Sequence, residues 1–203
     1  ITSSFLEKGD TVVTFAPDFS MYRFYASIYE AKNIDVSKEK SFAIDVDKAI
    51  ARIREEKAKM VIFSNPCNPT SLGLNREQVR RLIASVDALV VVDEAYMDFW
   101  NQSILQEVHK YDNVIVLRTC SKTIGMAALR LGFAVANPTI TRALRAVKSP
   151  YNVNTISQEM GTIIFSYPEK IHERTKAIIA AKDELENAVR KLSTQRQQIQ
   201  EIY

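Results

Sequence analysis

The chain has 203 residues, of which 46% are hydrophobic and 25% charged, values typical of globular proteins that bury a core without disulfides. Its net charge of +3 and its interspersed acidic and basic residues indicate no nucleic-acid surface. No apolar run reaches the roughly 18 residues of a membrane span, and the first residues lack the features of a signal peptide. The two cysteines, Cys67 and Cys120, are too few for a disulfide framework. We therefore expect a cytoplasmic protein with no membrane or nucleic-acid partner.

Short β-rich segments alternate with segments whose apolar residues have helical spacing. Strands are expected over 11–15, 34–36, 60–63, 88–92, 113–117 and 133–136. Helices are expected over 19–31, 46–57, 76–85, 155–166 and 168–192, with an N-cap at Asp45 and a capping box between Asn75 and Gln78. The segment 88–92 is apolar on both faces, as in a central parallel strand. This alternation predicts an α/β protein with an open, mostly parallel sheet.

Three polar segments each begin where a predicted strand ends. They are 65–70 (Asn-Pro-Cys-Asn-Pro-Thr), 93–96 (Asp-Glu-Ala-Tyr) and 119–125 (Thr-Cys-Ser-Lys-Thr-Ile-Gly). Ligands of parallel α/β sheets bind just beyond the carboxyl ends of the strands. We therefore expect the three segments to converge on one crevice.

The third segment contains Lys122, with Arg130 eight residues further on. A lysine amine near another cation is suited to forming a Schiff base with an aldehyde. The planar guanidinium of Arg130 suits a phosphate, and Thr119 and Ser121 offer hydroxyls to the same phosphate. Taken alone, Ser-Lys is more often a surface lysine in a polar loop. Arg130 and the nearby glycines favour the site.

The other two segments supply groups that suit a pyridine ring. Asp93 ends a buried strand, where a carboxylate is costly unless it is paired. A protonated pyridine nitrogen would pair it, and Tyr96 and Asn68 could hydrogen-bond the oxygen on the same ring. Together with Lys122, these groups predict a site for pyridoxal 5'-phosphate (PLP).

Each motif also has a simpler interpretation. An Asp-Glu pair at a strand end can bind a metal in phosphate-transfer enzymes, but the phosphate-binding loop of those enzymes is absent here. The segment containing Asn68 could be an ordinary strand-ending turn. His109 and His172 show no metal-ligand spacing, so no metal is expected.

With these residues in place, the chain resembles the fold-type-I PLP-dependent aminotransferases of class I and II, and most of all the branch that includes histidinol-phosphate aminotransferase and threonine-phosphate decarboxylase. The similar segments are 65–70, 93–96, 121–125, 128–132 and 150–154. The resemblance implies a three-layer α/β/α large domain with a long C-terminal helix leading toward a small domain.

The resemblance also implies a role for each site residue. Lys122 would be the catalytic Schiff-base lysine and proton carrier. Asp93 would pair with the ring nitrogen, Tyr96 and Asn68 with the ring oxygen, and Phe19 would stack on the ring. The residues implied to hold the phosphate are Thr119, Ser121 and Arg130.

The chain departs from the family pattern in two ways. Relatives have Gly after Asn-Pro-Thr, where this chain has Ser71, with Gly73 two residues later. Relatives also have an N-terminal segment with a phosphate-binding glycine loop and a C-terminal small domain. The chain is therefore expected to be the large domain cut at both ends, with 1–170 binding PLP and 171–203 linking toward the small domain.

The function implied is that of a homodimeric PLP-dependent aminotransferase with small-molecule substrates. It would move an amino group between an amino acid, or an amino-alcohol phosphate such as histidinol phosphate, and a 2-oxo acid. Two alternatives stay open: a PLP-dependent decarboxylase or lyase on the same scaffold, and a non-catalytic aminotransferase-like sensor domain. We expect little turnover from the isolated chain.

Overall fold

The computed structural model describes residues 1–196. The chain divides into two compact units. The first comprises Ile1–Thr119 with Gly132–Asn152, and the second comprises Cys120–Leu131 with the residues from Val153 onward. No helix within the described residues is long and apolar enough to cross a membrane.

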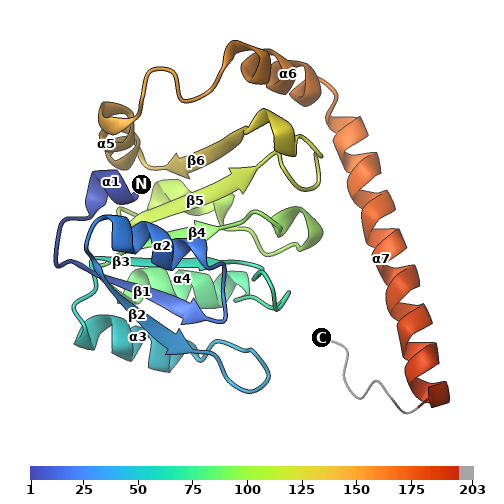
Figure 1. Cartoon of the computed structure of the whole chain (residues 1–203), viewed down its shortest axis with the longest axis horizontal. Coiled ribbons are helices and arrows are strands. Elements are labelled where there is room, and N and C mark those ends of the chain that lie inside the picture. Colours follow the sequence, from blue (N-terminus) through green and yellow to red (C-terminus); the bar gives the residue numbers. More distant parts are fainter. Residues whose placement is uncertain (197–203) are drawn as a thin grey trace. The chain divides into compact units, whose positions relative to one another are not determined.

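The first unit is built on a six-stranded sheet with the strand order β2-β1-β3-β4-β5-β6 (Figure 1). The first five strands in this order run parallel to one another, and β6 runs antiparallel to β5. This confirms the predicted mostly parallel sheet. The strands are β1 (Thr11–Ala16), β2 (Lys32–Ser37), β3 (Met60–Ser64), β4 (Leu89–Asp93), β5 (Val114–Thr119) and β6 (Gly132–Ala136).

Helices cover both faces of this sheet because its central strands alternate between two apolar cores. Val90 and Val92 face one core, whereas Val91 faces the other. The first core is closed by α3 (Val46–Glu55), α4 (Arg76–Ser85) and the 3-10 helix η2 (Leu105–Lys110). The second is closed by α1 (Thr2–Phe5), α2 (Met21–Ile28) and α5 (Pro138–Val147). The three-layer α/β/α arrangement is therefore confirmed (Figure 1).

Local capping fixes where several helices begin. The Asp45 side chain accepts from the Lys48 amide at the start of α3, and Asn75 and Gln78 form the predicted capping box of α4. No helix was predicted over α5, although Asn137 caps it and Pro138 occupies its first position. The short helix α1 and the 3-10 helix η1 (Met97–Phe99) were also not predicted.

The second unit contains a loop and two helices. The loop, residues 120–131, includes the 3-10 helix η3 (Ala127–Leu129) and packs through a small apolar cluster of Cys120, Met126 and Leu131. The helices are α6 (Thr155–Phe165) and α7 (Pro168–Arg196), as the sequence predicted. The assignment of domains to 1–170 and 171–203 stays a prediction, and residues 197–203 of that assignment lie outside the described part of the chain.

Candidate functional site

The predicted site residues are divided between the two units. Three of them, Ser121, Lys122 and Arg130, belong to the second unit. The first unit contains the other five, which are Phe19, Asn68, Asp93, Tyr96 and Thr119. All of these five lie at or just beyond a strand end on the carboxyl side of the sheet.

Asp93 is the last residue of β4, between two other strands of the sheet. Its Oδ1 accepts from the Ala95 amide at 3.1 Å, and its Oδ2 accepts from the Tyr22 hydroxyl at 2.7 Å. Tyr22 lies on α2, is 5% exposed and packs in the second core. Burial, followed by the neighbouring Asp93, raises the pKa of Tyr22, so its phenol stays protonated and donates to the carboxylate.

The sequence analysis missed Tyr22 as a site residue because its position fits an apolar helix face. A signal was nevertheless present. A carboxylate at the end of a buried strand needs donors, and a tyrosine on a buried helix face carries a hydroxyl that also needs a partner.

Replacing Tyr22 by phenylalanine tests this hydrogen bond. The ring still fills the core, but the Asp93 carboxylate loses one donor, so we expect the free energy of unfolding to fall by roughly 2 kcal/mol. Urea unfolding at neutral pH measures the change. Tyr167→Phe is the matched control, because Tyr167 is exposed, and it should leave stability unchanged. Equal stability of both variants would contradict the role of Tyr22.

The raised pKa of Tyr22 also sets the sign of a pH effect. Its contribution to folding is fully present below about pH 10, the ordinary pKa of tyrosine. The contribution is lost as the pH rises through the higher pKa that Tyr22 has in the folded state.

Phe19 and Asn68 are connected through the carboxylate of Asp18. Asp18 accepts from the Phe19 amide at 2.7 Å and also from the hydroxyl and the amide of Ser64, the last residue of β3. The Ser64 hydroxyl in turn accepts from the Asn68 amide at 3.1 Å. The Phe19 ring meets Tyr22 edge-on, with 5.5 Å between ring centroids. The structure therefore brings Phe19, Asn68 and Asp93 into one hydrogen-bonded and packed group.

The turn after β3 is fixed by Asn65. This buried side chain donates to the Leu74 carbonyl at 3.0 Å and accepts from the Leu74 amide at 2.7 Å. Gly73 lies against it, because a Cβ at that position would be 2.3 Å from Asn65 Oδ1. The two hydrogen bonds between Asn65 and Leu74 hold the ends of the turn that carries Asn68 together.

Ser71, in the same turn, has a positive φ of 61°. This left-handed conformation is unfavourable for residues with a Cβ and favours glycine. The departure from the family's glycine therefore has a conformational cost in this chain.

Replacing Ser71 by glycine should raise the free energy of unfolding by about 0.5–1 kcal/mol, because relief of the left-handed strain exceeds the extra freedom of glycine in the unfolded chain. Urea unfolding measures the difference. The matched control is Ser20→Gly, because Ser20 has an ordinary φ of −60° and makes no side-chain cap bond. A stability gain at position 20 as large as that at position 71 would refute the explanation.

Tyr96 lies in a segment that is held by the buried carboxylate of Glu94. Glu94 accepts from the Ser103 hydroxyl at 2.6 Å, the Ile104 amide at 3.0 Å and Arg118 at 3.1 Å. Arg118 comes from β5 and also pairs with Asp98. These bonds fix both ends of the segment 94–104 against the sheet, and Tyr96 lies within it. Sequence analysis gave Glu94 and Arg118 no role of their own.

In the second unit, Lys122 lies in a tight turn of the 120–131 loop. The Gly125 amide donates to the Lys122 carbonyl at 2.9 Å, and Gly125 has a φ of 77°. The loop is closed at its ends because the Cys120 amide donates to the Leu131 carbonyl at 3.0 Å. Gly161 of α6 lies against it, since a Cβ there would be 2.5 Å from Leu131 Cδ2. The turn and the close packing fix the backbone conformation of the loop that carries Lys122.

Arg130 ends η3 in a left-handed conformation, with φ of 54°. Its Nη1 donates to the Ala127 carbonyl at 2.9 Å, and the residue is exposed. A guanidinium carries five donors, so this one bond leaves it able to bind an anion. Ser121 and Lys122 lie at the other end of the same loop.

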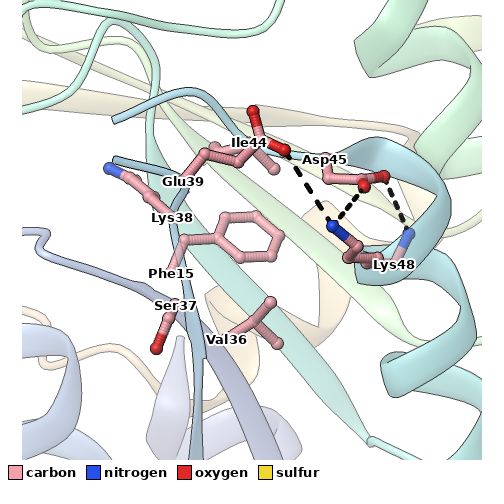
Figure 2. Close-up of a pocket in the computed structure, with 8 residues that line it drawn as sticks. All are labelled: Phe15, Val36, Ser37, Lys38, Glu39, Ile44, Asp45 and Lys48. Atoms are coloured by element: carbon pink, nitrogen blue, oxygen red, sulfur yellow. Dashed lines mark hydrogen bonds and ion pairs between the residues drawn. The ribbon is translucent and has the colours of Figure 1, made fainter. Parts of the chain in front are cut away.

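A cavity of about 180 Å³ lies elsewhere in the first unit (Figure 2). It is bounded by β1, β2, the segment that follows β2, and α3, and the Asp45–Lys48 ion pair at 3.0 Å lines it. None of the eight predicted site residues lines this cavity. It is therefore not the predicted site.

Taken together, the parallel sheet and the polar groups at its carboxyl edge are typical of α/β proteins that bind a small ligand beyond their strand ends. A family model described as aminotransferase class I and II matches residues 1–201. The chain belongs to this family, which confirms the resemblance found in its sequence.

Individual relatives agree with this assignment. The chain is 44% identical over 192 residues to a histidinol-phosphate aminotransferase from Clostridium novyi (strain NT), a match that covers 95% of this chain and 54% of that protein. It is 42% identical over 158 residues to a histidinol-phosphate aminotransferase from Thermoanaerobacter sp. (strain X514), covering 78% and 45%. The chain thus spans about half the length of the curated relatives it matches.

A solved structure supports the fold. The chain superposes with a TM-score of 0.85 and 21% identity on a crystal structure of histidinol-phosphate aminotransferase from Sinorhizobium meliloti in complex with pyridoxal-5'-phosphate. The match covers 91% of this chain and 51% of the other.

Proposed function

We propose that the protein, at its full natural length, is a PLP-dependent aminotransferase. It would move an amino group between a 2-oxo acid and an amino acid or an amino-alcohol phosphate such as histidinol phosphate. The observation that carries the proposal is the ordered set of site residues in a chain 44% identical to a histidinol-phosphate aminotransferase.

The groups present fit PLP in charge and chemistry. Asp93 offers a carboxylate to a protonated ring nitrogen, and two buried or backbone donors already orient it. Lys122 offers an amine to the aldehyde, and Arg130 offers a guanidinium to the phosphate. In the turn that carries Asn68, the buried hydroxyl of Thr70 has no hydrogen-bond partner among the described residues. A polar group left unsatisfied in this way is costly, as expected where a ligand completes a site.

PLP, when bound, withdraws electrons from the α-carbon of an attached amino donor. The residues of the chain would do the remaining work. Lys122 would hold the cofactor and then take up the α-carbon proton as a general base. Asp93 would keep the ring nitrogen protonated, and Asn68 and Tyr96 would donate to the ring oxygen. Phe19 would cover the ring face.

The phosphate would be held by Arg130 with the hydroxyls of Thr119 and Ser121. Chain connectivity supports their joint action with Lys122. Three peptide units, roughly 11 Å when fully extended, separate Lys122 from Thr119, and Arg130 lies two residues before Gly132, the strand partner of Thr119.

A homodimer is part of the proposal. Helix α2 exposes three large apolar side chains, Phe24, Tyr25 and Ile28, which is more than a solvated helix face needs. Sedimentation of the full-length protein would measure its mass in solution.

The test uses the full-length protein incubated with PLP and then reduced with borohydride. We expect one lysine, Lys122, to carry the cofactor in the peptide map. Histidinol phosphate with 2-oxoglutarate should then yield glutamate and no carbon dioxide. Carbon dioxide release from a phosphorylated amino acid would instead support a decarboxylase, and cofactor binding without turnover of any donor would support a sensor.

A further inference from the structure

We propose that Lys38 and Cys67 form an oxidative cross-linking site, in which a hydroperoxide converts the pair into a covalent sulfenamide between Nζ and Sγ. The reaction does not depend on the proposed aminotransferase chemistry, although Cys67 is next to Asn68 and Asp18 belongs to the hydrogen-bonded group around Phe19. It joins the segment after β2 to the turn after β3.

The two reacting atoms are already in contact. Lys38 Nζ lies 2.8 Å from Cys67 Sγ and 2.7 Å from the Pro17 carbonyl oxygen, to which it donates. The Lys38 side chain is only 1% exposed, and Cys67 is 4% exposed. A buried lysine side chain has little rotational freedom. The Lys38 ammonium therefore stays in contact with the Cys67 sulfur.

The third member of the cluster is Asp18. Its carboxylate lies 4.0 Å from Lys38 Nζ, and its side chain is 4% exposed. Burial is the main cause that raises the pKa of Asp18. The carboxylate is therefore a suitable acceptor for a proton that the lysine releases.

The composition of the first unit favours a lysine as the trapping group. A cysteine sulfenic acid condenses with a nearby thiol or with a nitrogen. Cys67 is the only cysteine among the residues of the first unit, so no second thiol of that unit can resolve it. The nucleophile that the structure places on its sulfur is the Lys38 amine.

The reaction has two balanced steps. Hydrogen peroxide first oxidises the thiol: its O–O bond breaks, one oxygen joins Sγ as a sulfenic acid, and the other leaves as water. Asp18 first accepts one proton from the Lys38 ammonium, and the lone pair of the neutral Nζ then attacks Sγ. The N–S bond forms as the S–O bond breaks, and the hydroxyl leaves as water with a second proton from the nitrogen.

Access to the cluster is restricted, so the first step should be slow. Buried thiols react less readily than exposed ones. Lys38 also lines the 180 Å³ cavity, and Figure 2 shows its ammonium pointing away from the Asp45–Lys48 pair. A cavity of this size can hold several water-sized molecules, but Cys67 is not among its lining residues, so a peroxide reaches the sulfur only through local opening of the turn.

The experiment exposes the full-length protein to hydrogen peroxide at neutral pH, blocks the remaining thiols and maps its peptides without reduction. We expect the peptides that contain residues 38 and 67 to appear joined, with the mass of their sum less two hydrogens. Dithiothreitol should separate them, because the sulfenamide is reversible.

Two variants make the result specific. Lys38→Arg keeps the positive charge but removes the amine, and the joined peptide should fall to background. Cys120→Ser should keep the joined peptide, because Cys120 takes no part. Circular dichroism verifies that both variants are folded. The proposal is overturned if Cys67 is oxidised to sulfinic or sulfonic acid without a link, if it stays reduced while Cys120 is oxidised, or if Lys38→Arg leaves the link intact.

Discussion

Replacing Lys122 by alanine is expected to abolish covalent capture of PLP by the full-length protein and to lower turnover by at least about 10²–10⁴-fold, the usual contribution of one general acid–base group. The reason is that no other group of the predicted site can both bond to the aldehyde and carry the α-carbon proton. Borohydride reduction followed by peptide mapping measures the first effect, and steady-state kinetics with histidinol phosphate measures the second.

The matched control for this variant is Lys176→Ala. Lys176 lies on α7 in the same unit and is exposed, so its removal should change neither measurement. If the Lys122→Ala protein still carried reducible cofactor on one particular lysine and retained its turnover, the assignment of Lys122 would be wrong. In that case the family membership would stand, but the proposed mechanism would not.

A second large effect is expected for stability. Replacing Arg118 by methionine removes the only cation that contacts the buried Glu94 carboxylate among the described residues. The Glu94 side chain is 0% exposed, so its charge cannot be compensated by water. Removing one partner of a buried ion pair costs about 3 kcal/mol or more, and urea unfolding at neutral pH should show a loss of that size.

If the unpaired Glu94 charge causes the loss, removing that charge should restore part of the stability. Glu94→Gln combined with Arg118→Met removes the unpaired charge from the fully buried position 94, so it should be more stable than Arg118→Met alone. Arg81→Met is the control, because both members of the Arg81–Asp47 pair are exposed, and its loss should be much smaller. A double variant that is no more stable than the single one would show that the buried charge is not the cause.

These two predictions differ in what the sequence could reveal. Lys122 can be proposed from the sequence because it lies in a motif with fixed neighbours, and a contiguous motif is visible without coordinates. Glu94 was visible only as the residue after Asp93. Its partners come from Ser103, Ile104 and β5, and nothing local in the sequence indicates that these groups meet.

The secondary structure follows the same division. The strand β4 and the helix α4 were predicted closely because Val90–Val92 are uniformly apolar and Asn75 and Gln78 form a local capping box. Helix α5 was missed, although Asn137 and Pro138 mark its start and its apolar residues Ile140, Leu144 and Val147 have helical spacing.

The sequence alone was enough to identify the α/β class, the family and the eight candidate site residues, because each depends on local spacing or on short motifs. The contacts that orient those residues came only from tertiary structure: Tyr22 on Asp93, Asp18 between Phe19 and Ser64, and Lys38 on Cys67. Such pairs join residues from separate elements of the fold. Their meeting depends on how helices and loops pack on the sheet, and no spacing along the chain encodes it.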